Sequence, residues 1–472
     1  MLPIVLQLSV RGKKICPIFA CDYFYMAGHL QVEVSYRQIW KIALPIAFAL
    51  LIPQLNLIIN GIFLGHHSEE SLAIASLTGV YYLVFAGIGF GLNNGLQTLM
   101  SRRAGENRPE EIGKLFTQGV LIALWIAIAG ILFTFLITPF LLRTFLSEQQ
   151  AEMSISFLYI RIMGLPFLYV YQLRNALLVS INRSRLLVLG TLAETLANIF
   201  FDYTLIFGKW GFPEMGFNGA AVASIIAEFT GMFIIYLVIR NKGIARQYSL
   251  FSSIRFDKVN AALISKVSGP LVFQHAASIL AWFFFYLLVA RNASQTGLAV
   301  STTMRAVFGF FGTFFWALAA TTNSMVSNVI GQGKRDAVML LMKKLSLLSF
   351  GIALFICSLL NLFPEVYLGL FRNDQNFINE GVPVLRAIAF AMLLLSIGTV
   401  WLNGVTGTGN SRATFMIEIV AITFYCIYVF FVLEVWHLSI LWGWLSELLY
   451  WAVLFSLSYL YLRSKRWRST VI

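Results

Sequence analysis

The chain has 472 residues, of which 59% are hydrophobic and only 12% are charged, and its mean hydropathy is +0.79. Soluble domains carry about 25% charged residues, so this composition excludes an ordinary soluble protein and indicates a polytopic membrane protein. The formal net charge of +13 would suit a nucleic-acid-binding protein, but its distribution along the chain points elsewhere.

A tail of 35 residues is predicted ahead of the first long apolar segment. Its apolar stretches are too short and too interrupted to cross a membrane. Met26 is an alternative start, in which case the residues before it belong to an over-long reading frame. The four cysteines, Cys16, Cys21, Cys357 and Cys426, lack the spacing of a metal site, and no metal centre is predicted.

Long apolar segments separated by charged or turn-rich loops follow the tail. About 20 apolar residues are enough to cross a hydrocarbon core, so we interpret each segment as a membrane-spanning helix. In the first half they are 39–64, 72–96, 115–141, 155–180, 186–207 and 217–239. In the second half they are 267–290, 298–325, 345–363, 383–402, 414–433 and 438–462. The predicted fold class is an all-α polytopic membrane protein with twelve transmembrane helices.

Basic residues gather on one set of alternate loops. These include 102–114, 240–266, 334–344 and 463–468, whereas the opposite loops hold only Arg143, Lys209, Arg291 and Arg372. Lys and Arg accumulate on the cytoplasmic side of membrane proteins, which places both termini in the cytoplasm. The net charge is therefore a topology signal, with anionic lipid headgroups as its partner and no nucleic acid.

An internal repeat recurs at a shift of about 225 residues. Pro45 recurs as Pro270, and the stretch SRRAGENR at 101–108 recurs as SNVIGQGK at 327–334. Both halves begin and end on the same side, so the repeat is parallel and predicts two six-helix lobes related by an axis along the membrane normal. Rocking of such lobes would expose a cavity between them to each side in turn, which is a transporter's architecture.

This organisation divides the chain into five parts. They are an N-terminal tail (1–35), an N-terminal lobe (36–240), a basic cytoplasmic linker (241–266), a C-terminal lobe (267–462) and a basic cytoplasmic tail (463–472).

The fifth span carries polar residues that lipid cannot solvate. Glu194, Asn198 and Asp202 are spaced four residues apart, so they lie on one face of a helix. Ionisable side chains inside a membrane span nearly always face a protein interior or a watered cavity, so we interpret this stripe as an ion-coupling site.

The first span contains two prolines and two asparagines. Pro45 and Pro53 each remove a backbone donor, so we expect this helix to bend or to contain a mobile segment. Asn56 and Asn60 share a face, and their amides could bond between helices or contribute to the site. Asn60 and Asp202 both lie in the outer half of the membrane, so they could meet there.

Further polar residues lie within the spans. Together with Asn56, the candidates to line the cavity are Ser224, Glu228, Gln274 and His275. Glu228, Glu418 and Glu447 could instead pair with Arg174, Arg305 or Arg386, and we favour pairing for Glu418.

Five motifs occur along the chain in a fixed order: Leu44-Pro45, the stretch NGIFLG at 60–65, Gly105, NIFFDYTLIFG at 198–208 and GFNGAAVAS at 216–224. Together they resemble the multidrug and toxic compound extrusion (MATE) family, most closely its DinF-like branch. The resemblance covers roughly residues 36–462. It implies an antiporter that couples the inward flow of protons or sodium to the export of organic, often cationic, compounds.

The resemblance also implies where the coupling ion binds. In the DinF-like branch a first-helix Asp acts with an Asn and an Asp of the fifth helix, and Asn198 and Asp202 match the latter pair. The first-helix Asp is replaced by Asn60. Since an amide cannot release a proton, the task falls to Asp202, helped by Glu194. In the other branch the ion site uses carboxylates of the seventh and tenth helices, where this chain has Gln274, His275 and Arg386 instead.

The predicted function is therefore proton- or sodium-coupled efflux of small organic compounds, cationic ones above all, by a protein of the bacterial inner membrane. Sodium, if it is the ion, would bind at Asp202 and Asn198, and no other cofactor is expected. We expect a monomer. A flippase for lipid-linked or polysaccharide units is the alternative, while an enzyme is not indicated, because the sequence lacks HxxxD and DxD clusters.

Overall fold

The computed structural model describes residues 30–67, 69–470 and 472, and across these residues it is helical with no β-strand. The first lobe contains α2 (Tyr36–His67), α3 (Glu69–Gly105), α4 (Pro109–Leu136), α5 (Thr138–Phe145), α6 (Glu148–Arg161), α7 (Leu165–Ser180), α8 (Leu187–Phe207) and α9 (Gly216–Asn241). The second contains α11 (Lys258–Asn292), α12 (Gln295–Gly331), α13 (Ala337–Leu362), α14 (Pro364–Gly369), α15 (Gln375–Gly407), α16 (Ser411–Val429), α17 (Ile440–Trp444) and α18 (Ser446–Arg463). The predicted all-α class is confirmed.

The membrane spans agree with the predicted ones, but the helices are longer. Within the described residues, 11 stretches are long and apolar enough to cross a membrane. The predicted second span, 72–96, corresponds to α3, a further helix of 37 residues. The predicted eighth span ends at residue 325, whereas α12 continues to Gly331. Helical hydrogen bonding does not stop where the hydrocarbon ends, so apolarity underestimates helix length.

The predicted loops contain more structure than their composition suggested. The linker at 241–266 includes α10 (Ile244–Gln247) and the first turns of α11, whose start is capped by Asp257 through the backbone N–H groups of Val259 and Asn260. In the C-terminal tail, the Trp467 side chain is buried, and its Nε1 donates to the carbonyl of Leu462. Of the N-terminal tail, residues 1–29 lie outside the described part, whereas Leu30 and Val32 are buried.

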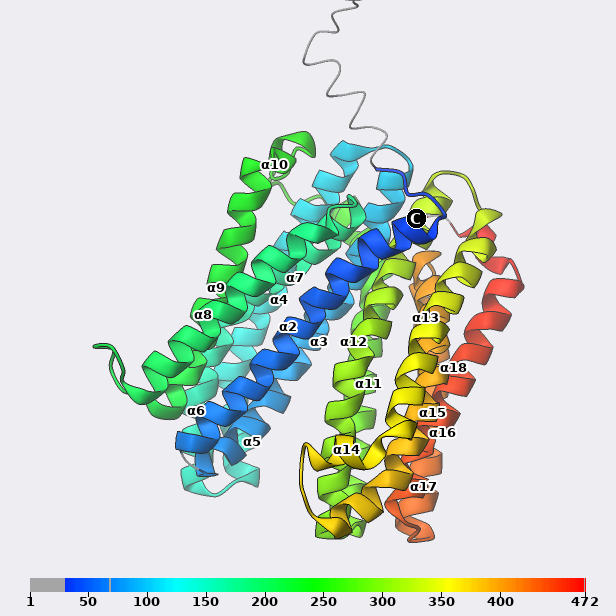
Figure 1. The fold of residues 1–472 in the computed structure, drawn as a ribbon. Coiled ribbons are helices and arrows are strands. Elements are labelled where there is room, and N and C mark those ends of the chain that lie inside the picture. Colours follow the sequence, from blue (N-terminus) through cyan, green and yellow to red (C-terminus); the bar gives the residue numbers. More distant parts are fainter. Residues whose placement is uncertain (1–29, 68, 471) are drawn as a thin grey trace, which may run out of the picture.

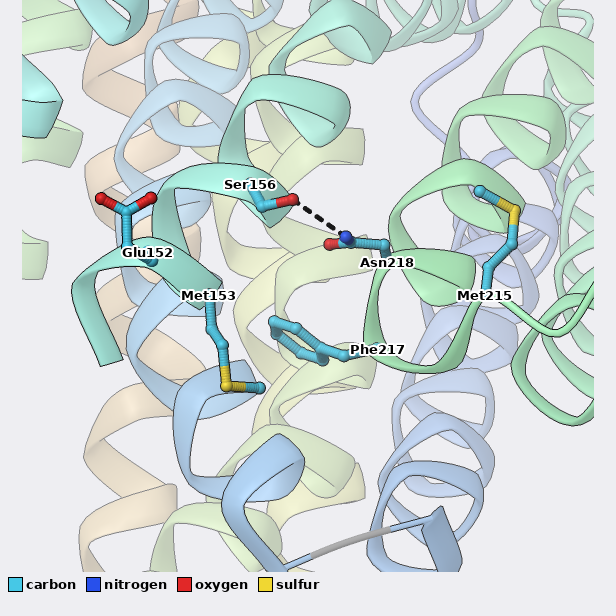
Figure 2. A pocket seen from close by; sticks show the side chains of 6 residues that line it. All are labelled: Glu152, Met153, Ser156, Met215, Phe217 and Asn218. Carbon is cyan, nitrogen blue, oxygen red and sulfur yellow. Dashed lines mark hydrogen bonds between the residues drawn. The ribbon is translucent and has the colours of Figure 1, made fainter. Parts of the chain in front are cut away.

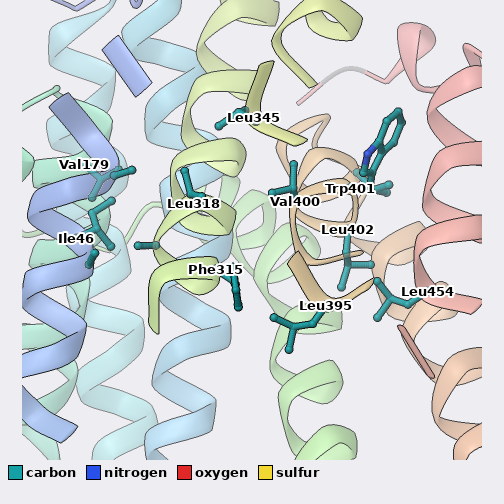
Figure 3. Close-up of a cluster of buried hydrophobic side chains, with 14 of the residues drawn as sticks. Ile46, Val179, Phe315, Leu318, Leu345, Leu395, Val400, Trp401, Leu402 and Leu454 are labelled. Atoms are coloured by element: carbon teal, nitrogen blue, oxygen red, sulfur yellow. The ribbon is translucent and has the colours of Figure 1, made fainter. Parts of the chain in front are cut away.

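The two lobes stand side by side (Figure 1). Their ribbons approach each other at the end where α10 lies and diverge towards α5, α14 and α17. The basic loops identified above lie at the converging end, which we call the basic side. A continuous apolar core runs through both lobes, and Figure 3 shows Ile46 of α2 near Leu318 of α12, with Val400 and Leu454 further into the second lobe.

Helices α3 and α12 occupy equivalent places in the repeat and contact each other directly. Thr98 Oγ1 donates to Asn323 Oδ1 at 2.7 Å, and the Ser101 and Ser324 hydroxyls lie 2.8 Å apart. These partners are separated by 225 and 223 residues, the predicted shift of the repeat. The pseudo-twofold axis therefore passes between α3 and α12, and neutral hydrogen bonds line it.

Towards the basic side the same pair of helices comes still closer. Buried Arg102 donates from Nε to the Ser327 carbonyl at 3.1 Å and from Nη2 to the Thr408 carbonyl at 3.0 Å, joining the first lobe to the second. A Cβ at Gly105 would collide with the backbone oxygen of Asn328, and one at Gly331 would collide with that of Arg102. Both positions must lack a side chain for the lobes to close on this side.

We predict that Gly105→Ala opens the basic side, because its methyl group cannot fit against Asn328. The readout is the rate at which an impermeant maleimide labels Ser324→Cys, a buried position between the lobes, in protein whose four native cysteines are replaced by Ser. Labelling should accelerate in Gly105→Ala. Gly351→Ala is the matched control, since a Cβ there meets nothing within 4 Å. Equal rates in the two variants would contradict the prediction.

Candidate functional site

Three asparagines and one aspartate from α2 and α8 form a polar cluster, which we call the Asp202 cluster. Asn56 and Asn60 are one turn apart on α2, and Asn198 and Asp202 are one turn apart on α8, so each pair presents its side chains on one face. Asn56 Nδ2 donates to Asn198 Oδ1 at 2.5 Å. The predicted meeting of the first and fifth spans in the membrane is therefore present in the structure.

The Asn60 amide bridges the two residues of α8 and has two usable orientations. In one, Nδ2 donates to Asn198 Oδ1 at 3.0 Å. Turned over, Nδ2 donates instead to Asp202 Oδ2 at 2.7 Å and to the main-chain oxygen of Asn56 at 3.2 Å. The second orientation satisfies an ionised carboxylate, whereas the first presents an amide oxygen to the carboxyl group.

The Asp202 cluster is buried but incompletely bonded. Asp202 is 0% exposed and Asn198 is 3% exposed. In the described structure, Asp202 Oδ1, Asn56 Oδ1 and Asn198 Nδ2 have no hydrogen-bond partner. A buried polar atom without a partner costs about 1–3 kcal/mol, so the two free oxygens favour binding of a proton or a small cation.

Glu194 lies on α8 one turn from Asn198, on the side away from Asp202. It belongs to a second group of residues. It is half-buried and lies near Tyr171, whose hydroxyl donates to Thr191 Oγ1 at 3.0 Å. The Arg174 guanidinium stacks on the Tyr171 ring, with Cζ 3.5 Å from the ring centroid. Both terminal nitrogens of buried Arg174 lack a hydrogen-bond partner in the described structure. Glu194, Asn198 and Asp202 therefore lie on one face of α8, but Glu194 has different neighbours from Asn198 and Asp202.

Glu228 does not pair with any of the arginines considered for it. Arg161 Nη2 lies 2.5 Å from Glu228 Oε1 and Nη1 lies 3.0 Å from Oε2, which makes a bidentate ion pair. Tyr82 donates to the same carboxylate at 3.2 Å, and its ring lies 3.7 Å below the guanidinium carbon. Glu228 is only 4% exposed, and in the described structure it forms a buried ion pair inside the first lobe.

Polar residues in the second lobe gather around Glu418. Gln274 donates to Glu418 Oε2 at 3.4 Å and Ser278 donates to Oε1 at 2.8 Å, while Tyr450 also hydrogen-bonds with Oε1. The expected ion pair of Glu418 with an arginine is wrong, because neutral donors from α11 and α18 surround it. His275 lies at the lobe boundary, where its Nε2 is 3.2 Å from Asn94 Nδ2 of α3.

The other predicted site residues lie on α2 and α9. Pro45 is half-buried and Pro53 is exposed, and α2 runs through both prolines as one continuous helix. Ser224 is half-buried on α9, one turn before Glu228. No group of three His, Cys, Asp or Glu side chains that could hold a metal occurs among the described residues.

Figure 2 shows a pocket of about 370 Å³ between α6 and the start of α9. Glu152, Met153 and Ser156 of α6 line one wall, and Met215, Phe217 and Asn218 at the start of α9 line the other. Asn218 Nδ2 donates to Ser156 Oγ at 2.9 Å across it. None of the predicted site residues lines this pocket.

Sequence reasoning missed the partners of the buried charges. Arg161 and Glu228 are 67 residues apart, on α6 and α9, and no local spacing connects them. The available signal was that both are charged residues within predicted spans, and such residues usually pair. Choosing the partner required the packing of α6 against α9.

The comparisons with known proteins agree with this architecture. The family model MatE matches residues 45–204 and 270–431, one segment in each lobe. A relative from Synechocystis sp., named a probable multidrug resistance protein NorM, is 27% identical over 385 residues, which is 77% of this chain and 80% of that protein. A protein of the same name from Thermotoga maritima is 23% identical over 453 residues, 94% of this chain and 95% of that one.

Solved structures share the fold. A MOP superfamily transporter from Pyrococcus furiosus superposes with a TM-score of 0.85 at 17% identity, covering 94% of this chain and 99% of that chain. A multidrug resistance MATE family transporter in an outward-facing conformation gives a TM-score of 0.84 at 17% identity, with the same coverage. At these identities the likeness establishes the fold.

The Arg161–Glu228 pair generates a stability prediction. Glu228→Gln leaves the buried guanidinium without its counter-charge, which should cost about 3–5 kcal/mol and lower the thermal unfolding midpoint in detergent. The matched control is Glu152→Gln. Its ion pair with Arg143 is more than half exposed on both sides, and such a pair contributes about 0–1 kcal/mol. Equal shifts of the midpoint in the two variants would show that the buried pair has no special role.

Proposed function

The chain belongs to the MatE family and is a membrane transporter rather than an enzyme, and from this we propose that it is a proton- or sodium-coupled antiporter that exports small organic compounds, chiefly cations. The NorM relatives, named as probable multidrug resistance proteins, support drug-like cargo. We place the protein in the bacterial inner membrane as a monomer, with the basic side and both termini in the cytoplasm.

The observation that carries this proposal is the Asp202 cluster. A fully buried carboxyl group surrounded by amides, with unpartnered oxygens on Asp202 and Asn56, is suited to binding a cation and releasing it. Asp202 makes no salt bridge in the described structure, and the guanidinium of Arg161 is paired with Glu228. A carboxylate in a permanent ion pair would be a poor ion carrier, and Glu228 is excluded from this role by its pairing with Arg161.

For a proton, we propose that the Asn60 amide turns over as Asp202 changes charge. The ionised carboxylate takes the Asn60 N–H at 2.7 Å. The protonated carboxyl group donates over the same distance to the Asn60 oxygen, while Asn60 Nδ2 donates to Asn198 Oδ1. An asparagine can therefore stand where the DinF-like pattern has an aspartate, with Asp202 as the carrier of the proton.

Sodium is the alternative ion at the same place. It prefers oxygen ligands, and the Asp202 cluster offers carboxylate and amide oxygens from Asp202, Asn56, Asn60 and Asn198. Placing the coupling ion in the first lobe is consistent with the DinF-like branch.

Alternating access would follow from rocking about the axis between α3 and α12. The neutral hydrogen bonds between Thr98 and Asn323 and between Ser101 and Ser324 can be exchanged for bonds with water, because no ion pair has to be broken there. In this conformation the basic side is closed. Helix α2 carries Asn56, Asn60 and both prolines, so ion binding at Asp202 can change its packing and bias the lobes.

We predict that Asp202→Asn reduces ion-driven transport to the level seen without a gradient. Wild type and variant are reconstituted in proteoliposomes of known orientation, and uptake of a fluorescent organic cation is driven first by a proton gradient and then by a sodium gradient. Glu447→Gln, another buried carboxyl group but in the second lobe, is the matched control and should keep transport. Full transport by Asp202→Asn would refute the coupling role. If folded wild type moves no cation under either gradient, a flippase for lipid-linked units becomes the better explanation.

A second variant tests the Asn60 amide. Asn60→Leu removes both the donor and the acceptor facing Asp202, so proton-driven uptake should fall several-fold even though the carboxyl group remains. Asn60→Asp restores a group that can bond Asp202 in either protonation state and should transport better than Asn60→Leu. The reverse order would show that the amide only fills space.

A further inference from the structure

The six residues ahead of α2 are part of the folded structure, although composition predicted a tail there. Leu30 is 4% exposed and Val32 is 6% exposed, and both join the main apolar core. Their position is the basic side, where the lobes converge. Because Leu30 and Val32 are apolar and bury their side chains in that core, withdrawing them would expose apolar surface to water.

The end of α12 in the second lobe holds this segment through two amide side chains, Asn328 within the helix and Gln332 directly after it. Asn328 accepts from the Val32 N–H at 3.1 Å and donates from Nδ2 to the Leu30 carbonyl at 2.9 Å, so one side chain satisfies two backbone groups. Gln332 donates from Nε2 to the Val32 carbonyl at 2.9 Å. Asn328 is 1% exposed, and its amide needs these partners.

Further contacts tie the segment to both lobes. In the second lobe, Lys344 Nζ of α13 donates to the Val34 carbonyl at 2.9 Å. In the first lobe, Gln31 Nε2 donates to the Gly105 carbonyl at the end of α3, also at 2.9 Å. Directly after the segment, α2 is fixed to the first lobe, where Gln38 Nε2 donates to Asn182 Oδ1 at 2.8 Å.

We propose that residues 30–35 form an interlobe strap that holds the basic side closed and sets how often the lobes open there. This proposal rests on alternating access as argued above. The strap begins the same helix that carries Asn56 and Asn60, but most of its hydrogen bonds are to the second lobe. When the basic side opens, the α12 and α13 bonds must break or the strap must be pulled away from α2.

The strap therefore connects the two halves of the mechanism. Helix α2 is bonded to α8 at the Asp202 cluster and to α12 and α13 through the strap. A shift of α2 on ion binding would displace the strap directly, because the strap continues into α2. No change in the cavity is needed to transmit this displacement. Residues 30–35 are thus a regulatory element rather than a passive leader.

The test measures lobe opening without substrate. Spin labels are placed at exposed Glu110 on α4 and exposed Lys343 on α13, and their separation is measured by pulsed EPR in liposomes. Val32→Pro removes the N–H that bonds Asn328, and Asn328→Ala removes the amide from the other partner. Val32→Pro should raise the population with the longer separation by about 3- to 10-fold, as expected for the loss of a single buried hydrogen bond. Asn328→Ala loses both of its bonds to the segment and should raise that population at least as much.

The matched control is Asn361→Ala on α13, an asparagine that donates only within its own helix, to Cys357, in the contacts described. It should leave the distance distribution unchanged. The strap proposal would be overturned if Val32→Pro and Asn328→Ala gave the same distance distributions as wild type and Asn361→Ala. If wild type and all variants show the same single separation with and without added protons or sodium, alternating access itself is contradicted. If the strap variants open the basic side while Asp202→Asn transports normally, the proposed strap is supported and the proposed coupling site is refuted.

Discussion

A carboxyl group buried among amides is the constraint on which the rest of this protein depends. Asp202 is shielded from water, and no salt bridge holds it among the described residues. Lipid cannot solvate such a group, so α8 must turn that face towards α2, and α2 must present amides at matching positions. The result is a site in which some polar atoms have no hydrogen-bond partner. Such a site contributes little to stability but is suited to binding an ion reversibly.

The parallel repeat fits the rocking motion that we propose the ion drives. Equivalent helices meet at the axis, so repeat-related residues such as Thr98 and Asn323 become direct partners. Small side chains and neutral donors let the two helices approach closely without an ion pair that would hold them permanently. Buried Arg102 crosses this interface but bonds only to backbone and hydroxyl oxygens there, and the buried ion pair of Arg161 with Glu228 lies within a single lobe. Rigidity inside lobes and weak bonding between them is the distribution that a rocking transporter needs.

The sequence predicted the fold well and the site in part. Apolar length alone located the spans, because crossing a membrane demands it, and four-residue spacing placed Asn198 and Asp202 on one face of α8. The depth of Asn60 and Asp202 correctly suggested that they could meet. The partners of Glu228 and Glu418 could not be predicted, since they come from helices far away in the chain. The strap was missed for a different reason: its contacts are backbone groups bonded by distant amides, and a short apolar stretch before a span looks the same whether it is bound or free.

The measurement that tests the central claim most directly is infrared difference spectroscopy of the carboxyl groups as the purified protein is loaded with protons or sodium. The assignment of the coupling ion to Asp202 predicts a band from one buried carboxyl group that responds to the ion in wild type and in Glu447→Gln but is missing in Asp202→Asn. A band that persists unchanged in Asp202→Asn would mean that another residue binds the ion, and the Asp202 cluster would then be only structural.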